Sequence, residues 1–433
     1  DHLPLPACDG EAAGGSVFDG TATGGPAPYT TTLGPDDELT GATARAGAPT
    51  GTTLNSANGI RIAYDDFTET DSPGGVIELL YTVPAAATPF ADGLSLVNQA
   101  LFLTGDSRDQ LANSQVAIDA LTIRQPDLSL TKGVVATDAT GGATGTVEFT
   151  PGAAAPAEIS FDLEQAGGDP AFTVSSPLTT ALLDASPIDS DLAGVDAGDR
   201  VKFAITVVNS GGEDAFDIAI EDALPVFEIN GAPQADHAFA IPSNGLGLDV
   251  RLGDGTEIIE DQTGVAPLSW SGDLFGGGIV INDGASDGAL AADGADDGRN
   301  IVIVSYELIA ETAITPNVTL TNTAELTRYA SIEGGSNFTL GVEGDFVDSA
   351  DVSTPGVAFD KRVTATSNDL TPGGNASDGG DVPGGNGAAI GEVVTYQLEI
   401  TIPEGETNIE IVDRLPSGFR LFDAAFAGGD GAP

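Results

Sequence analysis

Residues 198–207, with the sequence GDRVKFAITV, and residues 391–400, with the sequence GEVVTYQLEI, repeat one pattern. In both stretches a glycine and an acidic residue are followed by apolar side chains at every second position. Alternation with a period of two is typical of a β-strand that is buried on one face. The two stretches therefore predict equivalent strands in two copies of a β-rich repeat.

Two further motifs recur around these strands in the same order. A strand that closes in Asp-x-Leu-Pro spans residues 218–225 and recurs at 409–416, and the chain opens with the same four-residue motif at 1–4. A strand that ends in tyrosine, followed by a strand that contains asparagine, spans 301–326 and aligns with 76–102. Self-similarity of this kind is the signature of a repeat architecture.

The order of the motifs predicts three parts of the chain. Residues 1–126 form the back part of one β-sandwich repeat, residues 127–354 a complete repeat with insertions, and residues 355–433 the front part of a further repeat. We expect the chain to be a window of a longer polypeptide. The alternative is that half-repeats of neighbouring chains complete each other head to tail, although joining them would duplicate the Asp-x-Leu-Pro strand.

The composition favours strands and turns over helices. The 433 residues include 58 glycines and 26 prolines, and the length exceeds that of one sandwich of about 100 residues. We expect an all-β protein of tandem immunoglobulin-like β-sandwich repeats with long loops rich in glycine and aspartate. The surface loops are expected at 184–199, 282–300 and 367–387.

The charge balance excludes several classes of partner. Lys and Arg number 14 against 66 Asp and Glu, a net charge of -52 that repels nucleic acid and anionic membranes and attracts cations. Cys8 is the only cysteine, so the chain has no internal disulfide and no cysteine metal site. The sequence shows no apolar stretch of membrane length, so direct membrane insertion is not expected. We expect an exported, extracellular or cell-surface segment.

Three polar residues of the complete repeat share the inward face of their strands. Lys132, Asp222 and Asn322 each stand two positions from apolar residues that point into the predicted core. Burying such groups one at a time costs on the order of several kcal/mol each. We therefore expect the three side chains to meet inside the sandwich.

The partial repeats carry the equivalent residues. Lys361, Asp413 and Asn98 also stand two positions from apolar residues that point into the predicted core. Asp1 belongs to the first Asp-x-Leu-Pro motif. Lys361, Asp413 and Asn98 are expected to be buried. These two sites are expected to be incomplete, because the missing asparagine would follow residue 433 and the missing lysine would precede residue 1.

Lysine usage adds chemistry to this pattern. The chain has three lysines against eleven arginines. Lys132 and Lys361 occupy equivalent positions on the inward face of their strands. Lys202 lies between two inward-facing residues of its strand, so its side chain is expected to point to the opposite face and into solvent. A buried amine can lose its proton, which a guanidinium cannot. The neutral amine can then attack the side-chain carbonyl of Asn322 while Asp222 polarises it and moves protons, and ammonia leaves. The alternative is a buried ion pair that is hydrogen-bonded to the asparagine, with no covalent bond.

Taken together, the strands that carry Lys132, Asp222 and Asn322 resemble the isopeptide-forming, immunoglobulin-like repeats of bacterial surface and fimbrial proteins. The resemblance implies that Lys132 is the nucleophile, Asp222 the catalytic acid and Asn322 the bond acceptor. One departure is the spacing, since Lys132 stands 66 residues before its turn glycine (198 minus 132) and Lys361 only 30 before its own (391 minus 361). The insertion at 133–196 is therefore either an extra hairpin or a shift of Lys132 out of register.

Other candidate sites are weaker. Hard oxygen ligands for Ca²⁺ gather in one glycine-rich loop, at Asp283, Asp287, Asp293, Asp296 and Asp297. Calcium is thus a possible ligand, and no cofactor is required. No catalytic triad or informative acid pair stands out for an external substrate. Trp270 and Tyr329 are interpreted as core residues, with an exposed sugar-binding platform as the alternative.

These observations lead to one main interpretation. We expect a structural component of an extracellular filament or surface stalk, not an enzyme, whose repeats are stiffened by Lys–Asn isopeptide bonds and which associates with copies of itself. The alternative is a surface adhesin in which an insertion at 227–300 binds a ligand or glycan.

Overall fold

The computed structural model of the chain describes residues 17–22, 29–33, 39–40, 51–55, 59–63, 77–80, 90–106, 110–142, 146–152, 155–163, 172–229, 232–243, 245, 247–260, 269–281, 289–340, 345–367, 388–406 and 408–421. By its internal contacts the chain divides into two compact units, residues 1–88 with 95–122, and residues 89–94 with 123–433. The three-part division at residues 126 and 354 remains a prediction.

Strands dominate the described residues, which confirms the predicted all-β class. The described helices are short: α1 spans Thr180–Ala185 and the 3-10 helix η2 spans Phe338–Leu340. Helix α1 begins where the side chain of Thr179 accepts a hydrogen bond from the backbone N–H of Leu182, as a capping residue does. Among these residues no helix has the length and apolar character that crossing a membrane requires.

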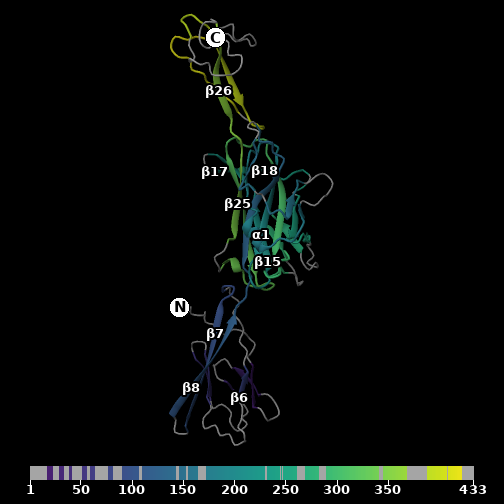
Figure 1. Ribbon diagram of the computed structural model, residues 1–433, viewed down its shortest axis with the longest axis vertical. Helices are drawn as coiled ribbons and strands as arrows, with labels where there is room; N and C mark the ends of the chain where they lie inside the picture. The colour runs from purple at the N-terminus through teal and green to yellow at the C-terminus, as the bar shows by residue number, and fades with distance from the viewer. Residues whose placement is uncertain are drawn as a thin grey trace. The chain divides into compact units, whose positions relative to one another are not determined.

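The first unit holds a small sheet and two hairpins. The sheet has the order β3-β2-β1-β6, and β4 pairs with β5 and β7 with β8. Figure 1 shows β7 and β8 as a long antiparallel pair. The strands are β1 Val17–Ala22, β2 Tyr29–Leu33, β3 Leu39–Thr40, β4 Gly51–Asn55, β5 Gly59–Ala63, β6 Ile77–Leu80, β7 Ser95–Asp106 and β8 Gln110–Thr122.

The second unit contains a β-sandwich of two large sheets, drawn in teal and green in Figure 1. The larger sheet has the order β10-β13-β25-β24-β15-β22-β21-β20, and the smaller has the order β18-β23-β14-β9, with β19 also paired to β23. Strands β11 and β12 form a separate hairpin, and so do β16 and β17. The strands are β9 Leu128–Thr137, β10 Glu148–Thr150, β11 Ile159–Phe161, β12 Phe172–Val174, β13 Asp191–Ala193, β14 Arg200–Asn209, β15 Phe216–Ala223, β16 Val226–Ile229, β17 Ala232–His237, β18 Phe239–Ala240, β19 Asp249–Leu252, β20 Ile259–Glu260, β21 Ser269–Asp273, β22 Gly278–Ile281, β23 Ile301–Ala310, β24 Thr319–Ala330 and β25 Val347–Ser353.

The main core lies between these two sheets. Alternate residues of each strand point into it, for example Phe203 of β14, Val304 of β23 and Leu326 of β24, all of which are at most 1% exposed. Removing one large apolar side chain from water contributes about 2 kcal/mol, so a core of this size dominates the stability of the sandwich. Trp270 packs partly buried against this core and Tyr329 is fully buried within it. The sugar-binding platform considered for these two residues is therefore wrong.

The smaller sheet is also covered on its outer face. A second apolar cluster joins Ala204 and Ile303 of that face to Ile159 and Phe172 of the β11–β12 hairpin and to Leu183 of α1. These covering elements come from the insertion expected at 133–196. The following residues, 184–199, were expected to be a surface loop, but Ile188, Leu192 and Val195 are at most 1% exposed because they pack under the same layer and into the main core.

The insertion does not shift the register of the first strand. In the pairing of β9 with β14, Lys132 lies opposite Ile205, seven positions after the turn glycine at 198. In the last of the predicted repeats, β26 (Ala358–Thr366) pairs with β27 (Val394–Thr401), and Lys361 lies opposite Leu398, again seven positions after the turn glycine at 391. The two lysines therefore occupy equivalent places, and the hairpin and helix of the insertion pack on the outer face of the smaller sheet.

The segment after β27 does not form the strand expected at 409–413. Residues 408–421 are described without strand pairing. In the complete repeat the equivalent strand, β15, lies between β24 and β22 and forms ladders with both. No described strand lies beside residues 409–413 in the way that β24 and β22 lie beside β15. A strand without paired neighbours leaves its backbone hydrogen-bonding groups unpaired.

Candidate crosslinking site

Four polar side chains meet between the two sheets of the sandwich. Lys132 comes from β9 and Tyr306 from β23, both in the smaller sheet, whereas Asp222 comes from β15 and Asn322 from β24 in the larger sheet. Each shares a strand face with core residues, which is why it points inward. The side chains of Lys132 and Asp222 are 0% exposed, and Tyr306 and Asn322 are also 0% exposed.

A continuous chain of hydrogen bonds joins the amine to the amide. Lys132 Nζ donates to both carboxylate oxygens of Asp222, each at 2.7 Å. The hydroxyl of Tyr306 donates to Asp222 Oδ2 at 2.5 Å and accepts a hydrogen bond from Asn322 Nδ2 at 2.8 Å. The carboxylate of Asp222 is therefore held between the amine on one side and the phenol on the other.

The carbonyl oxygen of Asn322 is in a different situation. Asn322 Oδ1 is buried and has no hydrogen-bond partner among the described residues. An unpaired buried acceptor costs about 1–3 kcal/mol, so it is an uncommon feature in a native core. The amide group of Asn322 is thus held through its nitrogen. Its carbonyl oxygen remains available to accept a proton, which would activate the carbonyl carbon as an electrophile.

Aromatic rings enclose the charged groups. The ring of Phe203 stacks on Tyr306 with centroids 5.5 Å apart, and Phe275 meets the Tyr306 ring edge-on at 5.3 Å. Lys132 Nζ lies 5.5 Å from the Phe203 centroid and 5.6 Å from the Tyr306 centroid. These rings exclude water and fix the phenol, which strengthens electrostatic interactions within the site.

Burial shifts the proton affinities of all three titratable groups. It lowers the pKa of the Lys132 amine to about 8, although the charge of Asp222 opposes that shift. Burial raises the pKa of Asp222 against the opposing effects of Lys132 and Tyr306. The pKa of the Tyr306 hydroxyl is raised well above its ordinary value by burial and by the Asp222 charge. Burial therefore brings the proton affinities of the amine and the carboxylate closer together, so that a proton passes more readily from Lys132 to Asp222, and it keeps the phenol protonated.

The partial repeats place their residues differently. Lys361 Nζ lies 2.7 and 2.8 Å from the two carboxylate oxygens of Asp413 and 4.8 Å from the Tyr396 ring centroid, but both side chains of the ion pair are 35% exposed. Asn98 is exposed on β7, opposite Asp119. The burial expected for these residues is absent because no second sheet covers them in the part of the chain that the structure describes. Asp1 lies outside the described residues.

Lys202 is buried, so its expected exposure was wrong. Its side chain is 0% exposed on the outer face of β14, where Nζ lies 3.2 Å from Glu307 Oε1 and donates to the carbonyl oxygen of Asp162. Arg200 pairs with the same Glu307 carboxylate. Strand parity shows that Lys202 and Lys132 point to opposite faces, but the covering layer makes the outer face a second interior.

Two of the five predicted calcium ligands, Asp283 and Asp287, lie outside the described residues. Asp293, Asp296 and Asp297 are described, and Asp297 Oδ1 accepts a hydrogen bond from the backbone of Arg299. In the described part of the chain, no three His, Cys, Asp or Glu side chains gather in a way that could hold a metal ion.

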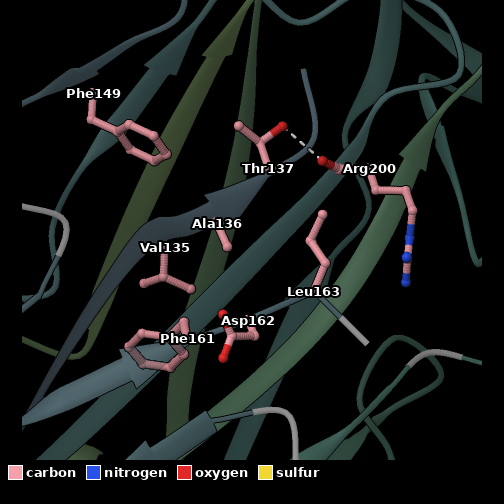
Figure 2. Close-up of a pocket in the computed structure, with 8 residues that line it drawn as sticks. All are labelled: Val135, Ala136, Thr137, Phe149, Phe161, Asp162, Leu163 and Arg200. Carbon is pink, nitrogen blue, oxygen red and sulfur yellow. Dashed lines mark hydrogen bonds between the residues drawn. The ribbon is translucent and has the colours of Figure 1, made fainter. Parts of the chain in front are cut away.

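A cavity of about 500 Å³ is lined by the residues drawn in Figure 2, which include none of the four buried site residues. Its lining includes one carboxylate, Asp162, and one cation, Arg200, which already pairs with Glu307. This arrangement offers no paired acids for general acid–base chemistry on a bound molecule. The lining residues are Val135, Ala136, Thr137, Phe149, Phe161, Asp162, Leu163 and Arg200.

Comparisons with known proteins give structural matches alone. No protein-family description and no curated protein matches the chain. Among solved structures, BcpA, the major pilin subunit of Bacillus cereus, matches at 10% identity with a TM-score of 0.25, covering 90% of this chain and 80% of BcpA. The RrgB pilus protein of Streptococcus pneumoniae matches at 13% identity and 0.25, covering 75% of this chain and 42% of RrgB. The T6 backbone pilin of Streptococcus pyogenes matches at 10% and 0.25, covering 83% of this chain and 66% of the pilin.

These matching structures are pilins, and at TM-scores of 0.25 the resemblance of this chain to bacterial fimbrial proteins stays a prediction. With TM-scores this low, they carry no information about individual residues. The chemistry of the site rests on the chain's own side chains and their distances.

Tyr306 is the one member of the site that the sequence motifs did not single out. It lies within the apolar strand β23, so the sequence pattern does not distinguish it from an ordinary core residue. A signal was nevertheless present, because a tyrosine precedes the motif asparagine by 16 residues in the complete repeat (322 minus 306) and by 17 in the first (98 minus 81). That recurrence marks the phenol as part of the repeated site.

Proposed function

We propose that the chain is a structural segment of an extracellular filament or surface stalk whose complete repeat closes an amide bond between Lys132 and Asn322. The observation that carries this proposal is the buried contact of Lys132, Asp222, Tyr306 and Asn322 across the two sheets. A buried ion pair alone often stabilises a core less than apolar residues of the same volume would. A site that instead prepares a reaction accounts for the cost of burying four polar groups.

The reaction balances without a cofactor. Neutral Lys132 Nζ attacks Cγ of Asn322, and the proton lost by Nζ goes to Asp222. The bond from Cγ to Nδ2 then breaks, and Nδ2 leaves as ammonia after it takes up one proton. The products are one secondary amide and one ammonia, and Asp222 ends the cycle in its starting state.

The bond would join the two sheets of one sandwich. Lys132 and Asn322 are 190 positions apart (322 minus 132), and closing a loop of that length restricts the unfolded chain by about 5 kcal/mol in the chain-entropy estimate. The chain has a single cysteine and so no internal disulfide to do the same. A covalent link between sheets suits a protein that has to bear tension.

The wider setting follows from composition and from the repeats. We place the chain at the cell surface, where it associates with copies of itself and acts on no external substrate. Calcium at the acidic loops is part of the same proposal, since a net charge of -52 favours cation binding. Specific binding to a glycan array would favour the adhesin alternative over the filament.

Peptide mapping tests the proposed bond. A digest of the folded chain should contain a branched peptide that joins part of β9 to part of β24 through Lys132 and Asn322. The branched peptide should disappear in Lys132→Arg, which keeps a cation but cannot offer a neutral amine. Lys202→Arg is the matched control because it changes the other buried lysine, and it should keep the branch. Recovery of the two unlinked peptides alone would contradict the proposal.

A further inference from the structure

The leaving group of the proposed reaction needs a proton donor of its own. The carboxylate of Asp222 receives the proton from Lys132, but its oxygens contact the amine and the phenol, and within the described part of the chain no hydrogen bond joins it to Asn322. Among the described residues, the group within hydrogen-bond distance of Asn322 Nδ2 is the hydroxyl of Tyr306, at 2.8 Å. The phenol therefore stands between the acid and the atom that has to depart.

We propose that Tyr306 is a catalytic residue of crosslink formation that passes a proton from Asp222 to the departing nitrogen of Asn322. This inference rests on the proposed Lys132–Asn322 bond and adds a fourth participant to it.

The relay balances in two linked transfers. Once Nζ has attacked, the leaving nitrogen becomes tetrahedral and gains a lone pair that faces the phenol. Tyr306 gives its proton to Nδ2 and takes the proton that Asp222 received from Lys132. The bond from Cγ to Nδ2 breaks and ammonia departs, while Asp222 returns to a carboxylate and Tyr306 to a neutral phenol.

The surroundings of Tyr306 suit this role. A hydroxyl both donates and accepts, and in the structure it already does both, toward Asp222 and from Asn322. Its pKa is raised well above the ordinary value by burial and by Asp222, so it stays protonated and acts as a relay rather than as a base. Stacking on Phe203 holds the ring in place, so little motion is needed to pass the proton.

Tyr306→Phe isolates the hydroxyl, because the variant keeps the ring and its stacking on Phe203. The chain would be isolated unlinked in denaturant and refolded by dilution, and the linked fraction followed by intact mass. General acid–base catalysis contributes about 10²–10⁴-fold, so bond formation in the variant should be at least about 100-fold slower than in the parent. An equal rate in Tyr306→Phe and in the parent would overturn the relay.

Phe203→Leu separates proton transfer from packing. It weakens the stacking on Tyr306 but leaves the hydroxyl, so it should slow bond formation far less than Tyr306→Phe does. If Phe203→Leu slows the reaction as much as Tyr306→Phe, the phenol acts through packing and the relay is wrong. A refolded parent that never loses ammonia would instead refute the proposed crosslink itself, so the two failures are distinguishable.

A solvent isotope measurement covers the case in which Tyr306→Phe does not fold. If protons move through Asp222 and Tyr306 in the slow step, the parent should form the bond more slowly in D₂O than in H₂O. A rate that is unchanged in D₂O would overturn the relay without the use of any variant.

Discussion

Lys132 is the residue on which the chemistry depends. Its amine lies 2.7 Å from both oxygens of Asp222 and is fully enclosed, so two opposing effects act on its proton. Burial disfavours the charged amine, whereas the carboxylate favours it, and burial is the larger effect. The result is a lysine that loses its proton near neutral pH, which is the property that a nucleophile needs.

The lowered pKa predicts a pH dependence of bond formation. With the pKa of Lys132 near 8 in the folded state, the neutral amine is about a tenth of the total at pH 7 and the larger part above pH 8. The rate on refolding should therefore rise between pH 6 and 8 and level off above. Intact mass after timed refolding at each pH measures it. A rate that is independent of pH over this range would contradict the assignment of the amine.

Removing the acid should be more harmful than removing the whole pair. Asp222→Ala should abolish the bond and leave the Lys132 amine enclosed without its carboxylate, which costs about 3–5 kcal/mol for a buried charge. The double variant Lys132→Met with Asp222→Leu also lacks the bond but buries no charge. Its urea midpoint should lie above that of Asp222→Ala. The reverse order would show that the pair is not buried as described.

At the scale of elements, the insertion between β9 and β14 turns the smaller sheet into a layer that is buried on both faces. The hairpin β11–β12 and helix α1 pack on the outer face of that sheet, where Ala204 and Ile303 contribute apolar contacts. Lys202 connects this layer to the sheet because it donates to the backbone of Asp162. The covering layer is thus held by the second apolar cluster, by Lys202 and by contacts such as the hydrogen bond from Asn300 Nδ2 to Thr180 of α1.

This arrangement predicts how the covering layer responds to substitution. Glu307→Leu removes the carboxylate that lies 3.2 Å from Lys202 Nζ and should cost about 3 kcal/mol of stability. Adding Lys202→Met should recover most of that loss. Amide hydrogen exchange in β11–β12 should speed up in the single variant and slow again in the double variant. Exchange that is unaffected by Glu307→Leu would contradict this role of the pair.

The alternation of side chains between the two faces of a strand explains which site residues could be predicted from the sequence. It placed Lys132, Asp222 and Asn322 on inward faces, and in the structure β9, β15 and β24 bring these side chains into one buried cluster. Parity gives only the relative direction of side chains, so it could not show that Lys202 lies under a second layer. It also could not separate Tyr306 from apolar core residues.

The partial repeats show that the alternation of side chains along a strand does not by itself predict burial. Lys361 keeps the register of Lys132 and contacts Asp413, because that pairing is decided within one part of a repeat. Burial depends on the facing sheet, which is a property of the whole sandwich. The local pattern around Asn98 and Lys361 therefore could not tell whether their faces are covered.

At the scale of the whole molecule, the crosslink should limit how far the chain extends under force. A bond between residues 132 and 322 removes 190 positions from the path between the termini, which is about 650 Å of extended chain. Single-molecule pulling of the parent should therefore give a contour length shorter by about this amount than that of Lys132→Arg. Equal contour lengths would show that no covalent path bypasses the sandwich.

The net charge of -52 should control self-association. Charged surfaces repel over about 10 Å at 0.1 M salt and over shorter distances at higher salt, so assemblies should grow with ionic strength. Sedimentation across a salt series measures this. Ca²⁺ and Mg²⁺ compared at the same ionic strength test the calcium proposal. A larger effect of Ca²⁺ supports specific sites, and equal effects contradict them.

The intact mass of the folded chain tests the crosslink most directly. The proposed bond predicts a mass lower than that of the sequence by one ammonia, about 17 Da, with the full mass restored in Lys132→Arg and the deficit retained in Lys202→Arg. A parent chain of full sequence mass would contradict the covalent bond and leave Lys132 and Asp222 as a buried ion pair.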